Sequence, residues 1–252
     1  MKKIYSYAIL SLLIMTVATT GCQKDDDAPS VSTLGRKIQT ITYTDSENKG
    51  EEQHQFEYDS KGKLTGVYRV NRGKTYTEYE YSDISDKSVT VNSDDIEYSL
   101  KISDGRLNGY TSRYGTADIS YTNDGYLKEY SYYEEDEDDK SVVTFTINDG
   151  LVTKIVEDDE TTIIEYGKVK NNLNIDILHY ICLDIDDGVN AASLLGLTGK
   201  RIALLPQKLS SQYKGHTIEE EFSYKFDGDY ISEIYSTYGD NDNWYKYVIT
   251  YE

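Results

Sequence analysis

Apolar and polar residues alternate along most of the chain. Residues 96–102 read IEYSLKI, so every second residue is apolar and the residues between are Glu, Ser and Lys. Residues 222–226, FSYKF, repeat the pattern. A period of two predicts β-strands with one buried and one solvated face. Because the solvated faces carry charge, they argue against a membrane-embedded barrel, whose outer face must be apolar.

A recurring turn joins these strands. Five segments run from alternating apolar residues into a polar turn with Gly and then to further apolar residues: FEYDSKGKLTGV, YSLKISDGRLNGY, ISYTNDGYLKEY, FTINDGLVTKI and FSYKFDGDYISEI. Gly tolerates the positive φ that tight hairpin turns require. The predicted turn glycines are Gly62, Gly105, Gly125, Gly150 and Gly228. Their spacing is irregular, which predicts a meander of unequal hairpins and not a solenoid.

Residues 171–199 break the strand pattern. Apolar residues between Ile177 and Ile185 recur at helical spacing, and a second short helix is predicted from Ala191 to Leu197, after a turn at Asp186–Gly188. The predicted fold class is therefore all-β: an antiparallel meander forming a curved sheet or barrel-like fold, with a small helical insertion packed against the sheet.

The first residues predict export. Two lysines precede an apolar stretch, and small residues lead to Cys22, which is typical of a secretory signal peptide at residues 1–21. Thr19 to Cys22 resemble a bacterial lipobox, whose cysteine is acylated, although Thr19 stands where Leu is usual. We expect lipidation at Cys22, a flexible acidic tether over residues 22–33, and one β-meander domain over residues 34–252.

The residues after Cys22 bear on orientation. Gln23–Asp27, QKDDD, look like the acidic signal that Bacteroidota lipoproteins use for display on the outer cell surface. We therefore expect a lipid-anchored protein of the outer membrane, exposed at the cell surface. If the segment is only a solvated linker, the domain faces the periplasm instead.

Charge and cysteine content exclude several partners. The chain carries 26 Lys and Arg against 45 Asp and Glu, a net charge of -19. Such a charge repels nucleic acid and anionic headgroups, and the sequence shows no basic patch. Assigning Cys22 to the lipid leaves Cys182 alone, so no intramolecular disulfide is expected.

Taken together, these motifs resemble a family of Bacteroidota lipoproteins of unknown function that is described as having a porin-like fold. The resemblance rests on the lipobox, the D-G hairpins, the NNLNIDI insertion with the LGLTGKR and LLPQKL segments, and the closing FSYKFDGDYISEI. It implies a many-stranded curved sheet or barrel-like meander and brings no catalytic residues.

Candidate chemistry is sparse. His179 and Cys182 are placed at i and i+3 on the predicted helix, but zinc needs further ligands, so a buried helix face is expected instead. No nucleophile elbow, phosphate loop or dinucleotide motif occurs, so we expect no enzyme and no cofactor. Acidic runs at residues 134–139 and at Asp184, Asp186 and Asp187 lack the spacing of a calcium loop, so no metal site is assigned.

Tyrosine is the strongest compositional bias, with 26 residues against 4 Phe and 1 Trp. Tyr130 and Tyr132 share one strand face, and Trp244 and Tyr247 lie on opposite faces of the last strand. Exposed rings beside carboxylates suit a glycan or a protein partner, and these four residues are the predicted ligand-binding set. The competing interpretation is that tyrosine serves only as a good strand former.

The predicted function is therefore a cell-envelope lipoprotein with a non-catalytic binding or scaffolding role. One alternative is a periplasm-facing carrier that holds an apolar molecule inside its curved sheet. A second alternative is a hydrolase that uses paired carboxylates.

Overall fold

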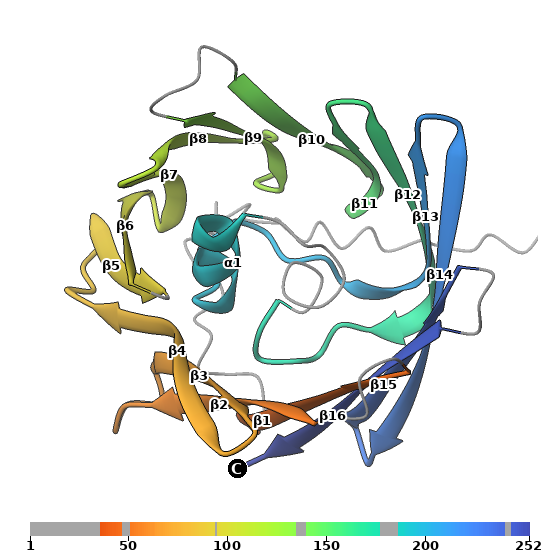
Figure 1. Ribbon diagram of the computed structural model, residues 1–252. Coiled ribbons are helices and arrows are strands. Elements are labelled where there is room, and N and C mark those ends of the chain that lie inside the picture. The colour runs from red at the N-terminus through yellow and green to blue at the C-terminus, as the bar shows by residue number, and fades with distance from the viewer. Residues whose placement is uncertain (1–35, 47–50, 94, 135–139, 177–185, 240–242) are drawn as a thin grey trace, which may run out of the picture.

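The chain folds into a closed antiparallel β-barrel (Figure 1). The computed structural model describes residues 36–46, 51–93, 95–134, 140–176, 186–239 and 243–252. The strands are β1 (Ile38–Asp45), β2 (Glu52–Tyr58), β3 (Leu64–Asn71), β4 (Lys74–Ser82), β5 (Ser88–Ser93), β6 (Ile96–Ser103), β7 (Arg106–Ser112), β8 (Gly115–Tyr121), β9 (Leu127–Glu134), β10 (Lys140–Asn148), β11 (Leu151–Glu157), β12 (Glu160–Lys170), β13 (Leu204–Tyr213), β14 (His216–Asp227), β15 (Tyr230–Tyr238) and β16 (Asn243–Tyr251).

Each strand pairs with its chain neighbours, and β1 pairs with β16 to close the ring. Within the described residues the one α-helix is α1 (Asp187–Leu194). The predicted all-β meander with a small helical insertion is therefore confirmed, and the sheet closes completely.

The predicted turn glycines adopt the expected backbone conformation. All five have positive φ, from +61° at Gly228 to +89° at Gly125. Asp104 and Asp149, which precede two of these glycines, also have positive φ. Two consecutive residues of positive φ form the type I′ turn, whose twist matches that of the flanking strands. The D-G pairs thus determine where these strands reverse.

The strands bury one face and solvate the other, as the alternation predicts. On β6, Tyr98 and Leu100 are buried inside the barrel, while Glu97, Ser99 and Lys101 are exposed outside. On β14 a register shift after Lys225 interrupts the alternation, which leaves Phe226 48% exposed. A polar exterior of this kind differs from the apolar band of a membrane-embedded barrel.

The connection from β12 to β13 fills part of the barrel, and α1 lies inside the ring (Figure 1). We call residues 171–176 and 186–203 the plug. Tyr81 on β4 donates its hydroxyl hydrogen to the carbonyl oxygen of Ala191, 3.1 Å away. The buried apolar residues of the plug are Leu173, Ile175, Val189, Ala191, Ala192, Leu194 and Ile202. They supply the centre of the hydrophobic core, which the sheet alone does not fill.

The position of the helix corrects the sequence prediction. A helix was expected from Ala191 to Leu197, yet α1 begins four residues earlier. The carboxylate of Asp186 accepts hydrogen bonds from the backbone N–H of Gly188 at 2.8 Å and of Val189 at 3.4 Å. Asp186 is thus the N-cap, and the predicted turn residues form the first helical turn. The helix predicted over residues 177–185, with His179 and Cys182, lies outside the described residues.

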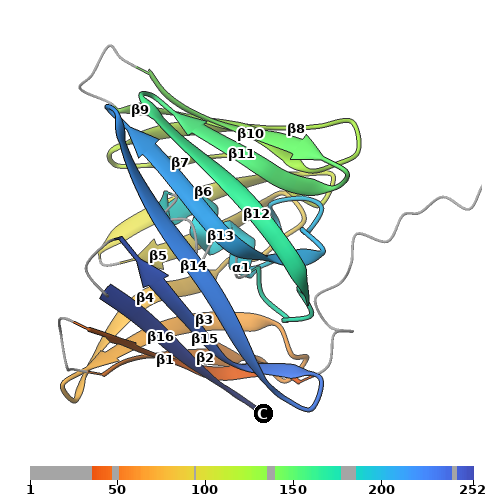
Figure 2. The same cartoon turned by 90° about the vertical axis from the view of Figure 1, so that its right-hand side faces the viewer.

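The two ends of the barrel differ (Figure 2). We call the end of the barrel where the described chain starts and ends the proximal end. There, Arg36 lies 4.0 Å from Asp227 and Lys37 lies 2.9 Å from Glu252, so the two chain ends lie side by side. Asn174 of the plug donates to the hydroxyl of Tyr58, which donates to the carbonyl of Ile38. The opposite, distal end carries the turns that join β11 to β12 and β13 to β14, together with the last residues of β1 and β15. No helix in the described part of the chain is long and apolar enough to cross a membrane.

Candidate functional site

The structure separates the four aromatic residues singled out in the sequence. Tyr130 is 6% exposed and faces the interior, and Tyr132 also faces inward, with its ring 6.2 Å from that of Tyr110. Trp244 faces outward and stacks on Tyr235 at 5.9 Å. Strand β9 carries the first pair and β16 the second, with six strands between them on the shorter path around the ring. The four residues therefore do not form one surface.

Tyr247 belongs instead to an inward-facing cluster at the distal end. We call it the tyrosine–carboxylate wall. Direct cross-strand pairs place Asp45 beside Tyr245, and Tyr43 beside both Tyr247 and Glu52. Because directly paired residues project from the same face of a sheet, these side chains share the inner surface. The wall comprises Tyr43, Asp45, Glu52, His54, Glu78, Tyr238, Tyr245 and Tyr247.

The tyrosines of the wall stack on one another. The rings of Tyr238 and Tyr245 lie 5.1 Å apart and are nearly parallel, at 7°. Tyr43 continues the row, 5.7 Å from Tyr245 and 5.3 Å from Tyr247. The rings of Tyr238, Tyr245 and Tyr43 are stacked across the sheet, whereas the ring of Tyr247 is tilted by 46° against that of Tyr43. A molecule inside the barrel therefore meets ring edges and hydroxyl groups.

Carboxylates hold the only histidine of the wall from two sides. Nδ1 of His54 lies 2.6 Å from Oε2 of Glu78, and Nε2 lies 3.4 Å from Oε1 of Glu52. Asn71 donates from Nδ2 to the second oxygen of Glu52 at 3.0 Å. The His54 side chain is 16% exposed. Both ring nitrogens of His54 and both oxygens of Glu52 are thus engaged within the wall.

Burial also keeps the phenol of Tyr43 neutral. Desolvation, followed by hydrogen bonding to Asp45, raises the pKa of Tyr43 well above its ordinary value. A neutral phenol next to a carboxylate donates one proton and still offers an oxygen lone pair. The wall therefore carries donors, in its phenols and His54, as well as acceptors, and Arg69 of β3 is directly paired with His54 on the same face.

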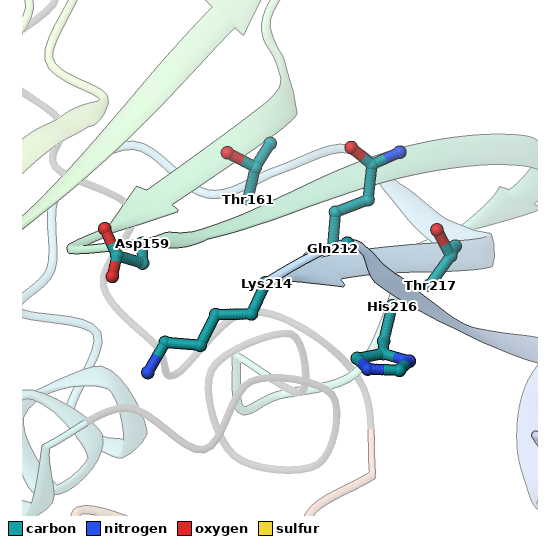
Figure 3. Close-up of a pocket in the computed structure, with 7 residues that line it drawn as sticks. Asp159, Thr161, Gln212, Lys214, His216 and Thr217 are labelled. Carbon is teal, nitrogen blue, oxygen red and sulfur yellow. The ribbon is translucent and has the colours of Figure 1, made fainter.

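A second feature is a shallow pocket of about 370 Å³ between the distal turns β11–β12 and β13–β14 (Figure 3). Thr161 and Gln212 are directly paired across the sheet and extend to one side of the ribbon, whereas Lys214 and His216 extend to the other. Nζ of Lys214 lies 4.7 Å from the ring centroid of Tyr213. The polar groups around this pocket do not converge on one point, so we prefer the wall as the candidate site.

The acidic runs form no metal site in the part of the chain that the structure describes. Asp186 caps α1, and Asp187 accepts hydrogen bonds from the hydroxyls of Tyr79 at 3.3 Å and Tyr98 at 3.4 Å. Asp184 and residues 135–139 lie outside the described residues. Burial raises the pKa of Asp186 above its ordinary value, although Tyr110 and two backbone N–H groups oppose the shift.

Sequence reasoning missed the wall as a unit. The alternation of Glu52, His54 and Phe56 is the signal that could have placed the first two on the face of the buried Phe56. Nothing local to the sequence joins that strand to Tyr245, because the link is the closure of β1 on β16.

Comparison with known proteins gives similarity of fold alone. No protein-family model matches the chain, and no curated protein does. A porin-like protein from Bacteroides uniformis ATCC 8492 superimposes with a TM-score of 0.63 at 14% identity, over 85% of this chain and 98% of that one. A porin-like protein from Bacteroides vulgatus ATCC 8482 gives a TM-score of 0.64 at 13% identity, over 86% and 99% of the two chains. The chain has a porin-like fold, as the sequence resemblance implied.

Proposed function

We propose that the protein is a non-catalytic binding protein of the bacterial cell envelope, anchored by lipid at Cys22. In this proposal the tyrosine–carboxylate wall is the binding surface, and its partner is a glycan or a protein. The four aromatic residues chosen from the sequence are replaced in that role, because only Tyr247 belongs to the wall.

The observation that carries the proposal is that the described chain starts at one end of the barrel and the wall lies at the other. The chain begins its first strand at the proximal end, where Arg36 and Lys37 contact Asp227 and Glu252. Residues 23–35 connect this end to Cys22 and span at most about 50 Å when extended. A lipid at Cys22 would thus tether the barrel from its proximal end, which is the end opposite the wall.

Partial exposure supports a binding role for the wall. Tyr43, Tyr238, Tyr245 and Tyr247 are half-buried, in contrast to fully buried core residues such as Leu100. A half-buried tyrosine combines a fixed ring with an accessible hydroxyl, and such residues are frequent anchors at recognition sites.

The two alternative functions have less support. A carrier of apolar molecules needs apolar interior space, but the plug packs Leu173, Ile175 and Leu194 into the centre of the barrel. A hydrolase needs one carboxyl group as acid and another as base or nucleophile. In the wall, Glu52 and Glu78 both contact His54 instead.

The anchoring half of the proposal is tested by Cys22→Ala. We expect the variant to leave the membrane fraction and to lose incorporation of a labelled fatty acid. Replacing Lys24–Asp27 with alanines should reduce digestion by protease added to intact cells. Equal fatty-acid labelling of Cys22→Ala and wild type would refute lipidation, and unchanged protease access would favour a periplasm-facing domain.

The binding half is tested with the full-length protein, purified from membranes in detergent. Glycan and peptide arrays are compared for wild type, Tyr245→Ala and Tyr235→Ala. Tyr235 is the matched control, because it stacks on Trp244 outside the barrel. We expect signals that Tyr245→Ala abolishes and Tyr235→Ala retains. Signals that survive Tyr245→Ala would place binding elsewhere.

A further inference from the structure

We infer that the distal rim of the barrel is a docking surface for a folded protein whose contact face is basic. The distal rim comprises four exposed tyrosines and the acidic turn that joins β11 to β12, namely Tyr76, Tyr114, Tyr133, Tyr213 and residues 157–160. These residues lie outside the tyrosine–carboxylate wall, so the docking surface is additional to the proposed function.

The most exposed tyrosines gather at the distal end. Because neighbouring strands are antiparallel, odd-numbered strands end there and even-numbered strands begin there. Tyr76 lies near the start of β4, and Tyr114 lies in the turn after β7. Tyr133 lies near the end of β9, and Tyr213 is the last residue of β13. These four residues are 39–51% exposed, more than any other tyrosine of the described residues.

Burial in the core does not explain tyrosine at these four positions. At the proximal end, Tyr58 and Tyr121 are half-buried, and each donates its hydroxyl hydrogen to a backbone carbonyl of the barrel. The rim tyrosines instead direct large apolar surfaces to solvent. Ile218 adds to them, because it is 53% exposed on the same face of the β13–β14 hairpin as Tyr213. Exposed apolar surface that is surrounded by polar residues is typical of protein association sites.

A cation holds each ring of the rim in place. The charged group lies 4.7–5.5 Å from the ring centroid in the pairs Arg113–Tyr114, Lys214–Tyr213, Lys140–Tyr133 and Arg69–Tyr76. Nη2 of Arg113 also donates to the hydroxyl of Tyr114 at 2.7 Å. Rings that are held before association lose little entropy on binding, and tyrosine and arginine are both enriched at protein interfaces.

The spacing of the rings sets the size of the partner. The tyrosines belong to β4, the β7–β8 turn, β9 and β13, which are distributed around the ring of strands (Figure 1). Sixteen tilted strands about 4.8 Å apart form a barrel about 30 Å wide, so Tyr76 and Tyr213, seven strands apart, are separated by roughly 25–30 Å. A disc about 30 Å wide covers about 700 Å², close to the area of about 800 Å² that each partner buries in a standard protein interface. A linear glycan follows a row of rings, whereas these rings surround the mouth of the barrel, so the arrangement favours a folded protein.

Charge specifies the contact face of that partner. The chain has a net charge of -19, and Glu157, Asp158, Asp159 and Glu160 are consecutive at the distal end. A negative surface accelerates the encounter with a basic partner and opposes that with an acidic one. The tyrosines thus supply the apolar contacts, and the acidic turn favours a basic face.

The experiment is photocrosslinking in intact cells that make the full-length protein. The photoreactive residue p-benzoylphenylalanine replaces Tyr76 or Tyr213, which lie on opposite sides of the rim. Phe226 is the matched control position, because it is 48% exposed like Tyr213 but lies at the proximal end. We expect one protein, identified by its peptide masses, to crosslink from both rim positions and not from Phe226. The yield should fall as salt is raised.

Variants then test which groups of the rim bind. With the photoreactive residue at Tyr213, Tyr114→Ala should lower the crosslinking yield severalfold, because tyrosine anchors carry much of the binding energy of an interface. Asp158→Asn should lower the yield about twofold or more at low salt. Asp149→Asn is the matched control, since Asp149 is also a turn aspartate of positive φ but lies at the proximal end. Thermal melting of each variant checks that the barrel remains folded.

Equal crosslinking from Phe226, different proteins from Tyr76 and Tyr213, or no crosslinked protein at all would overturn the docking surface. An adduct that resists protease and is destroyed by periodate would identify a glycan and would also overturn it. Tyr245→Ala changes the wall and not the rim, so the two proposals can fail separately. Array signals lost in Tyr245→Ala, together with failed crosslinking, would retain the wall and refute the rim alone. Crosslinking from both rim positions, with array signals unaffected by Tyr245→Ala, would do the reverse.

Discussion

The N-cap of α1 offers a direct test of how the plug is held inside the barrel. Asp186 accepts hydrogen bonds from the N–H groups of Gly188 and Val189, both of which are buried. Asp186→Ala leaves these two buried donors without their acceptor. Loss of an N-cap costs about 0.5–2 kcal/mol, and a buried unpaired group about 1–3 kcal/mol. Because the two effects describe the same hydrogen bonds, we expect a loss of about 1–3 kcal/mol.

Asp186→Asn separates the hydrogen bonds from the charge. Asparagine is as good an N-cap as aspartate, so both bonds can persist. Burial raises the pKa of Asp186, so the folded chain holds this proton more tightly than the unfolded chain. The folded state therefore loses stability as the pH rises from the ordinary aspartate range through the raised pKa. Asp186→Asn lacks this loss, and its stability relative to wild type should increase with pH.

Thermal melting followed by circular dichroism, at about pH 4 and about pH 7, measures both effects. For a domain of this size, 1 kcal/mol shifts Tm by about 2–4 °C, so Asp186→Ala should melt about 2–12 °C lower at neutral pH. Asp186→Asn should match or exceed wild type there. Equal destabilisation by the two variants would show that the cap geometry is not what holds α1. A pH-independent difference between wild type and Asp186→Asn would refute the role of burial.

Three further predictions concern the turns and the plug. Gly125 has φ +89°, so Gly125→Val should cost about 1–3 kcal/mol, and an unchanged Tm would mean that the turn tolerates a branched residue. An added Cβ at Gly199 would lie 2.7 Å from the Tyr121 ring, whereas one at Gly73 meets nothing within 4 Å. Gly199→Ala should therefore lower the free energy of unfolding, measured by urea titration, by about 2 kcal/mol more than Gly73→Ala does. Equal losses would refute the packing argument. Tyr58→Phe removes the hydroxyl that bridges β1 to the plug, so the free energy of unfolding should fall by about 1–3 kcal/mol in the same titration. A fall below about 0.5 kcal/mol would show that the bridge is dispensable.

Local chemistry in the sequence specified the hairpins. Alternation identified which side chains of β6 face the core, and the D-G pairs located the turns at Gly105 and Gly150. Both features depend on a residue and its immediate neighbours, since φ preference and side-chain alternation are properties of short segments. The same reasoning placed the start of α1 too late in the chain. Asp186 is the N-cap, so the residues after it, which resemble a turn, form the first helical turn.

Tertiary structure alone decided what the hairpins enclose. Closure of the barrel depends on pairing β1 with β16, for example Ile41 with Ile249, and no local pattern encodes a contact across two hundred residues. Closure brings Tyr43 beside Tyr247, and the same geometry separates Tyr130 from Trp244. The sequence by itself determined the two faces of regularly alternating strands such as β6. Only the ring of strands, filled by its own plug, determined which of those residues meet, because side-chain neighbours across a sheet are set by register and strand order.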